Sequence, residues 1–434
     1  MQLLSLIAAS ATLSIVASSP VKVNPGYVAV PIQVDRGATL GQSKETISMS
    51  VSRKEQLFLA DLEIGSNGEH VTVAVDTGSE YLWVMDSNVE CDVTNGDDCK
   101  EFGTFSSSDS KSFVKDEDRG EFQVSYLSGK KANGVWGNDD VSIAGSAPVH
   151  GFEFGVAQQA SSKIGILGLN FPSDGSQGYS LPQKLHEQGI IPRNAYSVFL
   201  NSKQAGSGSI MFGAVDHGKY DGDLVTVPVQ YDEEFPRVNV SARIDVNYQS
   251  NSVDSGKEVG YILDTGSTRS RLPGSYLDTL KQALGGSYDD QWKGISFDSC
   301  SKLDALIFYV NFYGKTITVP AKSLDYGTQG DRCLLQLNFN QDNDVFILGM
   351  DMLRSIYFLV DLDDREVQLA QARYGDDSKI EVFQSSGSQR LASSKKDVKV
   401  IATAAAVEEK TSAGAVIVNP IKAMIMGLLL ACFI

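Results

Sequence analysis

The 434-residue sequence is poor in the residues that most metal-dependent and serine hydrolases need. It has only four histidines, at positions 70, 150, 186 and 217, and none of them forms the H-x-x-x-H spacing of a zinc site. No G-x-S-x-G motif occurs, which argues against a Ser-His-Asp hydrolase. Basic residues are also in deficit, with 37 Lys and Arg against 54 Asp and Glu and a net charge of −17. Because phosphate binding needs clustered Lys and Arg, a nucleic-acid partner is not expected.

The two ends of the chain are apolar and have the pattern of processing signals. Residues 1–17 combine an apolar core with small residues near Ala17, as in a secretory signal peptide, although they lack a basic start. The uninterrupted apolar stretch at the other end, Ala423–Ile434, has only 12 residues, which is too short to span a bilayer comfortably. Small residues lie upstream of it and are candidate attachment sites: Ser412, Ala413 and Gly414. Residues 414–434 are therefore predicted to be a glycosylphosphatidylinositol (GPI) attachment signal that is removed, with a tail-type membrane anchor as the alternative.

Cysteine is scarce, and its spacing fits a secreted protein. The five residues are Cys91, Cys99, Cys300, Cys333 and Cys432. Removal of the tail would leave the first four. Their separations suggest the disulfides Cys91–Cys99 and Cys300–Cys333, although four cysteines allow three pairings. One sequon, N-V-S at Asn239, predicts an N-glycosylation site.

Strand signals dominate the middle of the chain. Apolar and β-branched runs at 57–65 and 70–76 flank a turn sequence, and similar short runs separated by Gly, Ser, Asn and Asp continue to about residue 374. Helix-like periodicity is rare, with candidates at 181–189 and 274–284. Residues 18–54, which end in the basic pair Arg53–Lys54, are predicted to be a pro-segment. The Ser-, Lys- and Ala-rich residues 376–413 are predicted to be a stalk.

An internal repeat carries the functional signal. Residues 71–79 read V-T-V-A-V-D-T-G-S and residues 259–267 read V-G-Y-I-L-D-T-G-S, so Asp76 and Asp264 each follow an apolar run and open the same motif. Downstream of each motif stands an apolar-apolar-glycine element, G-I-L-G-L at 165–169 and F-I-L-G-M at 346–350. Two similar units in the same order predict two lobes related by an approximate two-fold axis. Such an axis would bring the two aspartates face to face.

Two carboxyl groups held face to face have a defined chemistry. They cannot both ionise cheaply, so the pair keeps one proton from acid to near-neutral pH. The ionised member can deprotonate a shared water while the protonated member donates to the scissile carbonyl. This arrangement hydrolyses an amide without an acyl-enzyme and without a metal.

On these paired motifs the chain resembles the pepsin-type aspartic endopeptidases over residues 55–375. The resemblance implies a mostly β, bilobal fold with two pseudo-symmetric lobes, residues 55–225 and 226–375, and an active-site cleft between them. Asp76 and Asp264 are then the catalytic pair, acting on protein or peptide substrates in a monomer that needs no cofactor. The residues expected to support the pair are Thr77, Gly78, Ser79, Thr265, Gly266 and Ser267. By the same resemblance, Thr77 and Thr265 are expected to exchange hydrogen bonds across the axis. The signal, stalk and tail resemble the GPI-anchored fungal yapsin branch in particular, which places the enzyme in the secretory pathway and at the plasma membrane or cell wall.

Further positions match this family one at a time. Trp83 lies where the family's tryptophan braces the flap, the hairpin that crosses the cleft, and Tyr126 lies where the flap tyrosine is expected. Thr268 is expected to help to bind the substrate backbone. Four positions depart from the family pattern: Glu80, Leu127, Arg269 and Arg271. On a strand the two arginines would share one face.

An acidic segment motivates a prediction about substrates. Residues 90–121 hold ten acidic residues against four basic ones, and by resemblance this segment borders the cleft. A cleft edged by negative charge would favour Lys or Arg next to the scissile bond, as the yapsin resemblance also implies. Lys130 and Lys131 at the flap tip, with Arg269 and Arg271 opposite, work against this preference. The alternative is that most of the acids are ordinary solvated loop residues without a role in substrate choice.

Two other functions fit parts of the pattern. A wall protein of this fold can be a catalytically idle peptide-binding module, or a polysaccharide hydrolase that uses paired carboxylates. Both D-T-G-S motifs are intact, which argues against an idle module. Their near-identical surroundings argue against a glycosidase, because its acid and its nucleophile need distinct environments.

Overall fold

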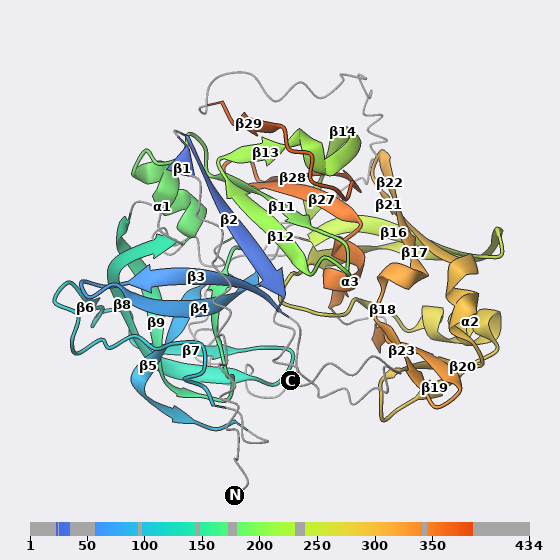
Figure 1. The fold of residues 1–434 in the computed structure, drawn as a ribbon, viewed down its shortest axis with the longest axis horizontal. Coiled ribbons are helices and arrows are strands. Elements are labelled where there is room, and N and C mark those ends of the chain that lie inside the picture. The colour runs from blue at the N-terminus through green and yellow to red at the C-terminus, as the bar shows by residue number, and fades with distance from the viewer. Residues whose placement is uncertain are drawn as a thin grey trace, which may run out of the picture.

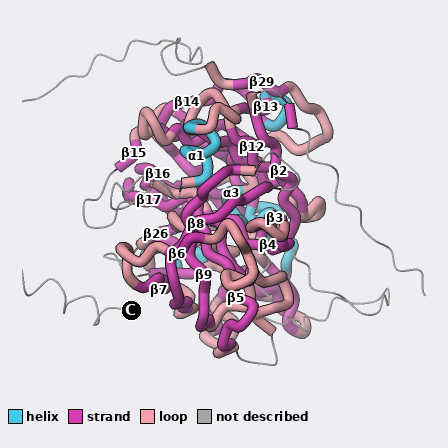
Figure 2. Tube along the Cα trace, turned by 90° about the vertical axis from the view of Figure 1, so that its left-hand side faces the viewer, coloured by secondary structure: helices cyan, strands magenta, loops and turns pink. Residues whose placement is uncertain are grey.

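The computed structural model describes residues 23–24, 26–34, 57–93, 98–143, 148–171, 180–230, 239–340 and 345–384. Strands make up most of this part of the chain, and the helices are short and scattered among them (Figure 2). The mostly β, bilobal fold predicted from the sequence is therefore confirmed. The predicted signal peptide, the attachment tail with Ser412, Ala413 and Gly414, and the stalk beyond residue 384 lie outside the described residues. Within the described residues, no helix is long and apolar enough to cross a membrane.

The largest sheet joins strands from both halves of the chain (Figure 1). Its central path runs in the order β14 (Tyr220–Val227), β28 (Glu366–Ala372), β27 (Ile356–Asp361), β11 (Ala195–Leu200), β12 (Ser207–Phe212), β2 (Tyr27–Val34), β3 (Phe58–Ile64), β4 (Glu69–Asp76), β10 (Gly165–Gly168), β5 (Leu82–Cys91), β9 (Val149–Ala160), β8 (Lys131–Ile143) and β6 (Val114–Lys115). Two further strands pair off this path, β1 (Val23–Asn24) with β2 and β7 (Glu121–Ser125) with β8. The sequence of β3, F-L-A-D-L-E-I, alternates buried and more exposed positions, as a strand with one face on the core requires.

The C-terminal lobe is built on a second sheet of eight strands, on the right of Figure 1. Its strands are β22 (Lys315–Pro320), β21 (Leu306–Phe312), β16 (Asn239–Tyr248), β17 (Asn251–Leu263), β26 (Phe346–Leu348), β18 (Arg271–Pro273) and β25 (Asn338–Asn340), with β15 (Val229–Gln230) paired to β16. A four-stranded sheet packs beside it and contains β19 (Ser287–Asp289), β20 (Gly294–Phe297), β24 (Arg332–Leu335) and β23 (Tyr326–Gln329). Asn239, the residue of the sequon, is the partly exposed first residue of β16.

The two lobes repeat one local topology around the paired motifs. In the N-terminal lobe, β10 pairs parallel with β4 and antiparallel with β5. In the C-terminal lobe, β26 pairs parallel with β17 and antiparallel with β18. Because β4 and β17 lead into the two D-T-G-S turns, the repeat places both turns in equivalent positions.

Both helices predicted from the sequence are present. They are α1 (Leu181–Glu187) and α2 (Ser275–Leu284), and the structure adds α3 (Met350–Leu353) and three 3₁₀ turns, η1 (His217–Lys219), η2 (Cys300–Ala305) and η3 (Ala321–Ser323). α2 buries Tyr276, Leu280 and Leu284, which are spaced by four residues and so lie on one face. It ends at Gly285, whose φ of 62° gives the left-handed cap that glycine adopts at little cost.

Two segments outside the predicted lobes are built into the body. Strand β2 belongs to the predicted pro-segment, yet it lies between β12 and β3 in the largest sheet, with Val28, Val30 and Ile32 buried. At the other end, β29 (Ile380–Val382) pairs with β13 (Ala214–Asp216), and Phe383 beyond it is buried. The predicted start of the stalk at residue 376 is therefore too early, because the packed body extends to Phe383.

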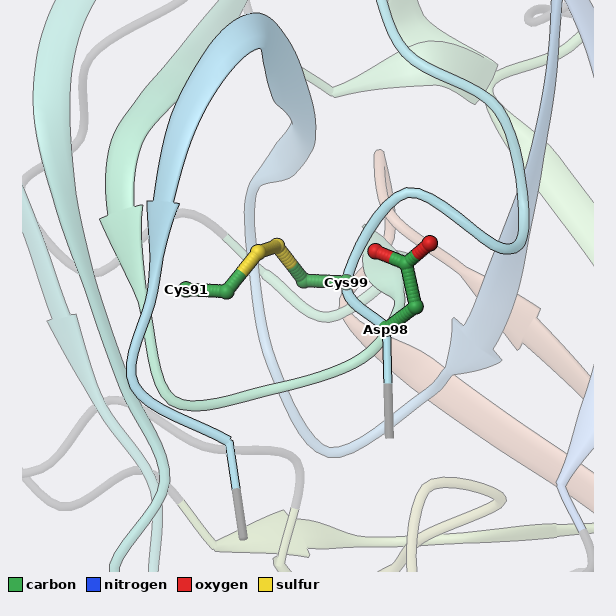
Figure 3. A group of neighbouring side chains, drawn as sticks. All are labelled: Cys91, Asp98 and Cys99. Atoms are coloured by element: carbon green, nitrogen blue, oxygen red, sulfur yellow. A yellow bond between two sulfur atoms is a disulfide. The ribbon is translucent and has the colours of Figure 1, made fainter. Parts of the chain in front are cut away.

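The two predicted disulfides, Cys91–Cys99 and Cys300–Cys333, are both present, one in each lobe. Figure 3 shows the first of them with Asp98 beside it. The ligand atoms of Cys91, Asp98 and Cys99 lie within 4.8 Å of one another, a spacing that can hold a metal ion. The two sulfurs are bonded to each other, however, which leaves only the Asp98 carboxylate as a possible metal ligand. The disulfide therefore closes a loop covalently.

Candidate active site

The two aspartates stand at the ends of equivalent strands. Asp76 is the last residue of β4, and its carbonyl accepts a 2.9 Å hydrogen bond from the amide of Leu169. Asp264 directly follows β17, and its amide donates a 3.0 Å hydrogen bond to the carbonyl of Leu348. In both lobes, therefore, the apolar-apolar-glycine strand fixes the backbone of the aspartate from the side.

Two threonines lock the turns together across the lobe boundary. The amide of Thr77 donates to Oγ1 of Thr265 at 3.1 Å, and the amide of Thr265 donates to Oγ1 of Thr77 at 3.0 Å. Each hydroxyl then donates to a carbonyl of the opposite lobe, Thr77 to Leu263 at 2.6 Å and Thr265 to Val75 at 2.8 Å. Both threonines are buried, and this closed set of four hydrogen bonds is the exchange that was predicted for them.

Two glycines let the turns approach each other closely. A Cβ placed on Gly78 would lie 2.6 Å from Cγ of Asp264, and one placed on Gly266 would lie 2.6 Å from Cγ of Asp76. Each glycine thus faces the carboxyl group of the opposite lobe at a distance that no other residue permits. The two carboxyl groups are hydrogen-bonded to each other.

Each carboxyl group also receives donors from its own turn. Oδ1 of Asp76 accepts from the amide of Gly78 at 2.8 Å, and Oδ2 accepts from the hydroxyl of Ser79 at 2.6 Å. The same pattern holds in the other lobe, where Gly266 donates at 2.8 Å and the Ser267 hydroxyl at 2.7 Å to Asp264. These donors orient both carboxyl groups before a substrate arrives.

The surroundings of the first carboxyl group disfavour its charge. Burial of Asp76, together with the negative charge of Asp264, raises the pKa of the Asp76 carboxyl well above its ordinary value. The donors on Ser79 and Gly78 favour the charged form and offset this rise only in part. The pair therefore holds one proton over a wide pH range and titrates as a unit.

Residues 57–372 match the family model described as eukaryotic aspartyl protease. The chain belongs to this family. It is 34% identical over 360 residues to "Secreted aspartic protease 10" of Candida albicans, covering 78% of this chain and 76% of that protein. It is 32% identical over 382 residues to "Secreted aspartic protease 3" of the same organism, covering 82% and 93%. The solved aspartic proteinase of Irpex lacteus shares the fold, with a TM-score of 0.62, 19% identity, and coverage of 80% of this chain and 98% of that one. The protein is thus an aspartic endopeptidase.

The hairpin that the sequence predicts to be the flap reaches toward the first aspartate. β7 and β8 form this hairpin, and Tyr126 stands at its turn, where its amide bonds to the carbonyl of Lys130 at 2.9 Å. Nε1 of Trp83 donates to the Tyr126 hydroxyl at 2.7 Å, and that hydroxyl also hydrogen-bonds to Ser79. Because Ser79 gives its own proton to Asp76, the Tyr126 proton points to Ser79. A chain of hydrogen bonds therefore runs from Trp83 through the flap to Asp76.

The flap rests on an aromatic cluster that the sequence did not reveal. Phe122 of β7 meets Trp136 of β8 edge to face, with ring centroids 4.9 Å apart, and lies 6.2 Å from Trp83. The guanidinium of Arg119 stacks over Trp136 at 3.8 Å and pairs with Glu153. Such contacts hold the base of the hairpin while its tip, with the exposed Leu127, stays open to solvent.

Replacing Tyr126 by phenylalanine should weaken substrate turnover without unfolding the protease. The variant keeps the ring but loses the hydroxyl that links Trp83 to Ser79. We expect kcat/KM for a peptide to fall by roughly 10–100-fold, in line with loss of a positioning contact, while the melting temperature changes little. Steady-state kinetics and thermal unfolding of the two proteins test this. Tyr220→Phe, far along the chain from the flap, is the control and should keep full activity.

Other predicted positions lie nearby but differ in detail. Thr268 is partly exposed in the turn that follows Asp264. Strand β18 begins only at Arg271, so the expectation that Arg269 and Arg271 share one strand face is wrong: Arg269 lies in the preceding turn, with its Nε 3.9 Å from Asp325. One buried residue behind the aspartates, Tyr196, was not found from the sequence. Tyr196 donates to the carbonyl of Leu169 at 2.9 Å, and the negative charge of Asp76 adds to burial in raising its pKa.

Proposed function

We propose that Asp76 and Asp264 are the catalytic dyad of this endopeptidase and hydrolyse peptide bonds through a water held between them. The observation that carries the proposal is the crossed packing of Gly78 and Gly266, each on the carboxyl group of the other lobe. The ionised carboxyl takes a proton from the water, and the protonated one donates to the scissile carbonyl. The donors from Ser79 and Ser267 keep both groups oriented, and Tyr126 covers the site and excludes bulk water.

The pH dependence of activity follows from the shared proton. Because the pKa of Asp76 is raised in the folded protein, the one-proton state persists from acid pH upward and is lost when the pH rises through the upper apparent pKa of the pair. A raised folded pKa also stabilises the fold most at pH values below the unfolded value, and this contribution disappears as the pH rises through the folded one. We expect kcat/KM and the melting temperature both to fall toward alkaline pH. Activity that increases steadily to pH 9 would contradict the dyad.

Membership of the aspartyl protease family argues against the two alternative functions that the sequence left open. A catalytically idle binding module would keep peptides intact, and a polysaccharide hydrolase would need an acid and a nucleophile in different surroundings. The matched donor sets on Asp76 and Asp264 argue against the second alternative. Release of sugars from glucan or chitin, with peptides left uncut, would favour it.

A preference for Lys or Arg next to the scissile bond is part of the proposal, but its basis is narrower than the sequence suggested. The carbonyl of Asp109 accepts from Asn67, in the turn that starts β4, roughly 20 Å from the Asp76 end of that strand. Acids of that part of the segment are remote from the dyad. The support comes from Asp116, Glu117, Asp118 and Glu121, which lie just before and at the start of flap strand β7. Matched peptides with Lys, Arg, Leu or Phe before the cut, assayed at low and high salt, test the preference; a salt-independent choice of Leu or Phe would refute it.

The pro-segment is proposed to be removed near Arg53–Lys54. β2 of this segment lies beside β3, which starts at Phe58, only a few residues after the basic pair. β3, the first strand of the proposed mature enzyme, therefore pairs with β2 of the segment that is proposed to be removed. N-terminal sequencing of the secreted protein should give a start near residue 55. A mature protein that starts at residue 18 would show that the segment is retained.

Surface anchoring is proposed from the sequence of the tail, which resembles that of the GPI-anchored yapsin branch. The relatives named above are called secreted proteases. Deleting residues 415–434 should release an active enzyme into the medium. Retention of the shortened protein on cells would mean that another part of the chain holds it there.

A further inference from the structure

A buried carboxyl group, Asp351, lies directly behind the second D-T-G-S turn. It is the second residue of α3, which follows Gly349, and it is 2% exposed. A Cβ placed on Gly349 would lie 2.6 Å from the carbonyl carbon of Arg269 and 2.9 Å from the carbonyl oxygen of Ser267. The amide of Met350 also donates to that Ser267 oxygen at 2.8 Å. The start of α3 is thus pressed against the backbone that continues from Asp264.

One oxygen of Asp351 is crowded with donors and the other has none. Oδ1 accepts from the amide of Ser270 at 2.9 Å, from the Ser270 hydroxyl, and from the amide of Met352 at 2.8 Å. The Ser270 hydroxyl in turn accepts from the amide of Gly349 at 3.0 Å. Oδ2 is buried without a hydrogen-bond partner, and among the described residues no Lys, Arg or His forms an ion pair with Asp351. A charge on this group is therefore poorly compensated, because burying an unpaired charge is costly.

The N-terminal lobe has an amide at the equivalent place. Asn170 follows Gly168 by two residues, as Asp351 follows Gly349, and its Oδ1 accepts from the amide of Phe171 at 2.8 Å. This is the counterpart of the bond from Met352 to Asp351. The pseudo-symmetric position thus works with a neutral side chain in one lobe and a titratable one in the other.

The nearby charges do not favour ionisation of Asp351. Burial raises the pKa of Asp351 to about 6, and the negative charge of Asp325 adds to the rise. Asp325 is itself held by Lys203 at 2.9 Å, with Arg269 at 3.9 Å, so these two cations are directed toward Asp325. The hydrogen bonds from Ser270 and Met352 act in the opposite direction but only in part.

We propose that Asp351 is a positioning residue for the second aspartate. In its neutral form Asp351 fixes Ser270 and therefore the turn that carries Asp264. In its ionised form it loosens that turn. The inference rests on the proposed catalytic role of Asp264. Ionisation leaves an unsolvated negative charge on Oδ2, which is relieved when water enters or the carboxylate turns out of its site. Either change removes acceptors from the amide and hydroxyl of Ser270. Asp351 then sets the upper pH limit of activity below the limit set by the dyad itself.

The deciding variant is Asp351→Asn, which copies the residue of the other lobe. Its amide oxygen keeps the three hydrogen bonds from Ser270 and Met352 and cannot ionise. We expect kcat/KM at pH 4 to stay within about twofold of the wild type, and the upper pH midpoint of kcat/KM to move up by about half a unit or more. Ser270→Ala should also move that midpoint up, because the ionised form then loses one of its donors and the pKa of Asp351 rises further. A purely structural role would change the melting temperature at every pH and leave the pH midpoint where it was.

Asp216→Asn is the matched control. Asp216 is also 2% exposed, but its oxygens accept from the amides of Gly218 and Lys379 and from the hydroxyl of Ser378, far along the chain from the dyad. This variant should lose stability without an upward shift of the pH midpoint. Activity that survives Asp264→Asn would overturn both the proposed function and this inference. If Asp264→Asn abolishes activity but Asp351→Asn has the same pH profile as the wild type, this inference alone is overturned.

Discussion

Replacing Asp264 by asparagine is expected to abolish peptide hydrolysis, with kcat falling about 10,000-fold or more. The amide has nearly the same shape and can still accept from Gly266 and Ser267, but it cannot exchange a proton with a water. Asp76→Asn should have the same effect, because one proton is shared between both carboxyl groups. Single-turnover and steady-state assays of purified proteins, with thermal unfolding to verify the fold, measure the loss.

The control for this prediction is a buried carboxyl group elsewhere. Asp139 is 1% exposed and accepts from the hydroxyl of Ser110 at 2.6 Å, at the far end of the N-terminal lobe. Asp139→Asn should keep peptidase activity even if stability falls. If either dyad variant retained more than a few per cent of wild-type activity, acid–base catalysis by two aspartates would be wrong.

Replacing Gly266 by alanine should be nearly as damaging, although it changes no titratable group. The new Cβ would stand 2.5 Å from Oδ1 of Asp76 and 2.6 Å from its Cγ, so the two turns must separate. A displacement of about 1 Å at a reacting group costs on the order of 100-fold in rate. We expect kcat to fall at least that far, and the Thr77–Thr265 exchange to weaken with it, so that the melting temperature drops as well.

Gly151→Ala separates this contact from the general cost of replacing glycine. Gly151 has a φ of 58°, and a Cβ there would meet nothing within 4 Å. The substitution should cost about 1–2 kcal/mol of stability through the left-handed backbone and leave kcat unchanged. Equal losses of activity in the two variants would show that the tight packing at Gly266 has no special role.

The sequence predicted best those features that short local motifs encode, and the main motif of this chain occurs twice. The two D-T-G-S motifs, each after an apolar run, specify both the turns and their symmetry, and the family resemblance implies the exchange between Thr77 and Thr265. The helix at 275–284 was visible from its helix-like periodicity. The disulfides followed from separations of 8 and 33 residues.

What the sequence did not predict depends on contacts between distant segments. β2 and β29 lie in parts of the chain that were assigned to a pro-segment and a stalk. A three-residue strand such as β29 has too little pattern to stand out, and the pattern of the eight-residue β2 does not show which sheet it joins. Their place is decided by the partners β12 and β13. In the same way Asp351 reads as an ordinary acid after F-I-L-G-M, and only the fold puts it behind Ser270. The role of Arg119 is likewise visible only in the structure, where its guanidinium stacks over Trp136.

The central claim is that two aspartates, sharing one proton, cut peptide bonds. The most direct measurement is the cleavage of a mixed peptide library between pH 3 and pH 8, with and without pepstatin, by the wild type and by Asp76→Asn prepared in the same way. The dyad predicts internal cleavage by the wild type at acid pH that is lost toward alkaline pH, blocked by pepstatin, and undetectable in the variant. Cleavage that persists in Asp76→Asn, or that pepstatin leaves unchanged in the wild type, would contradict it.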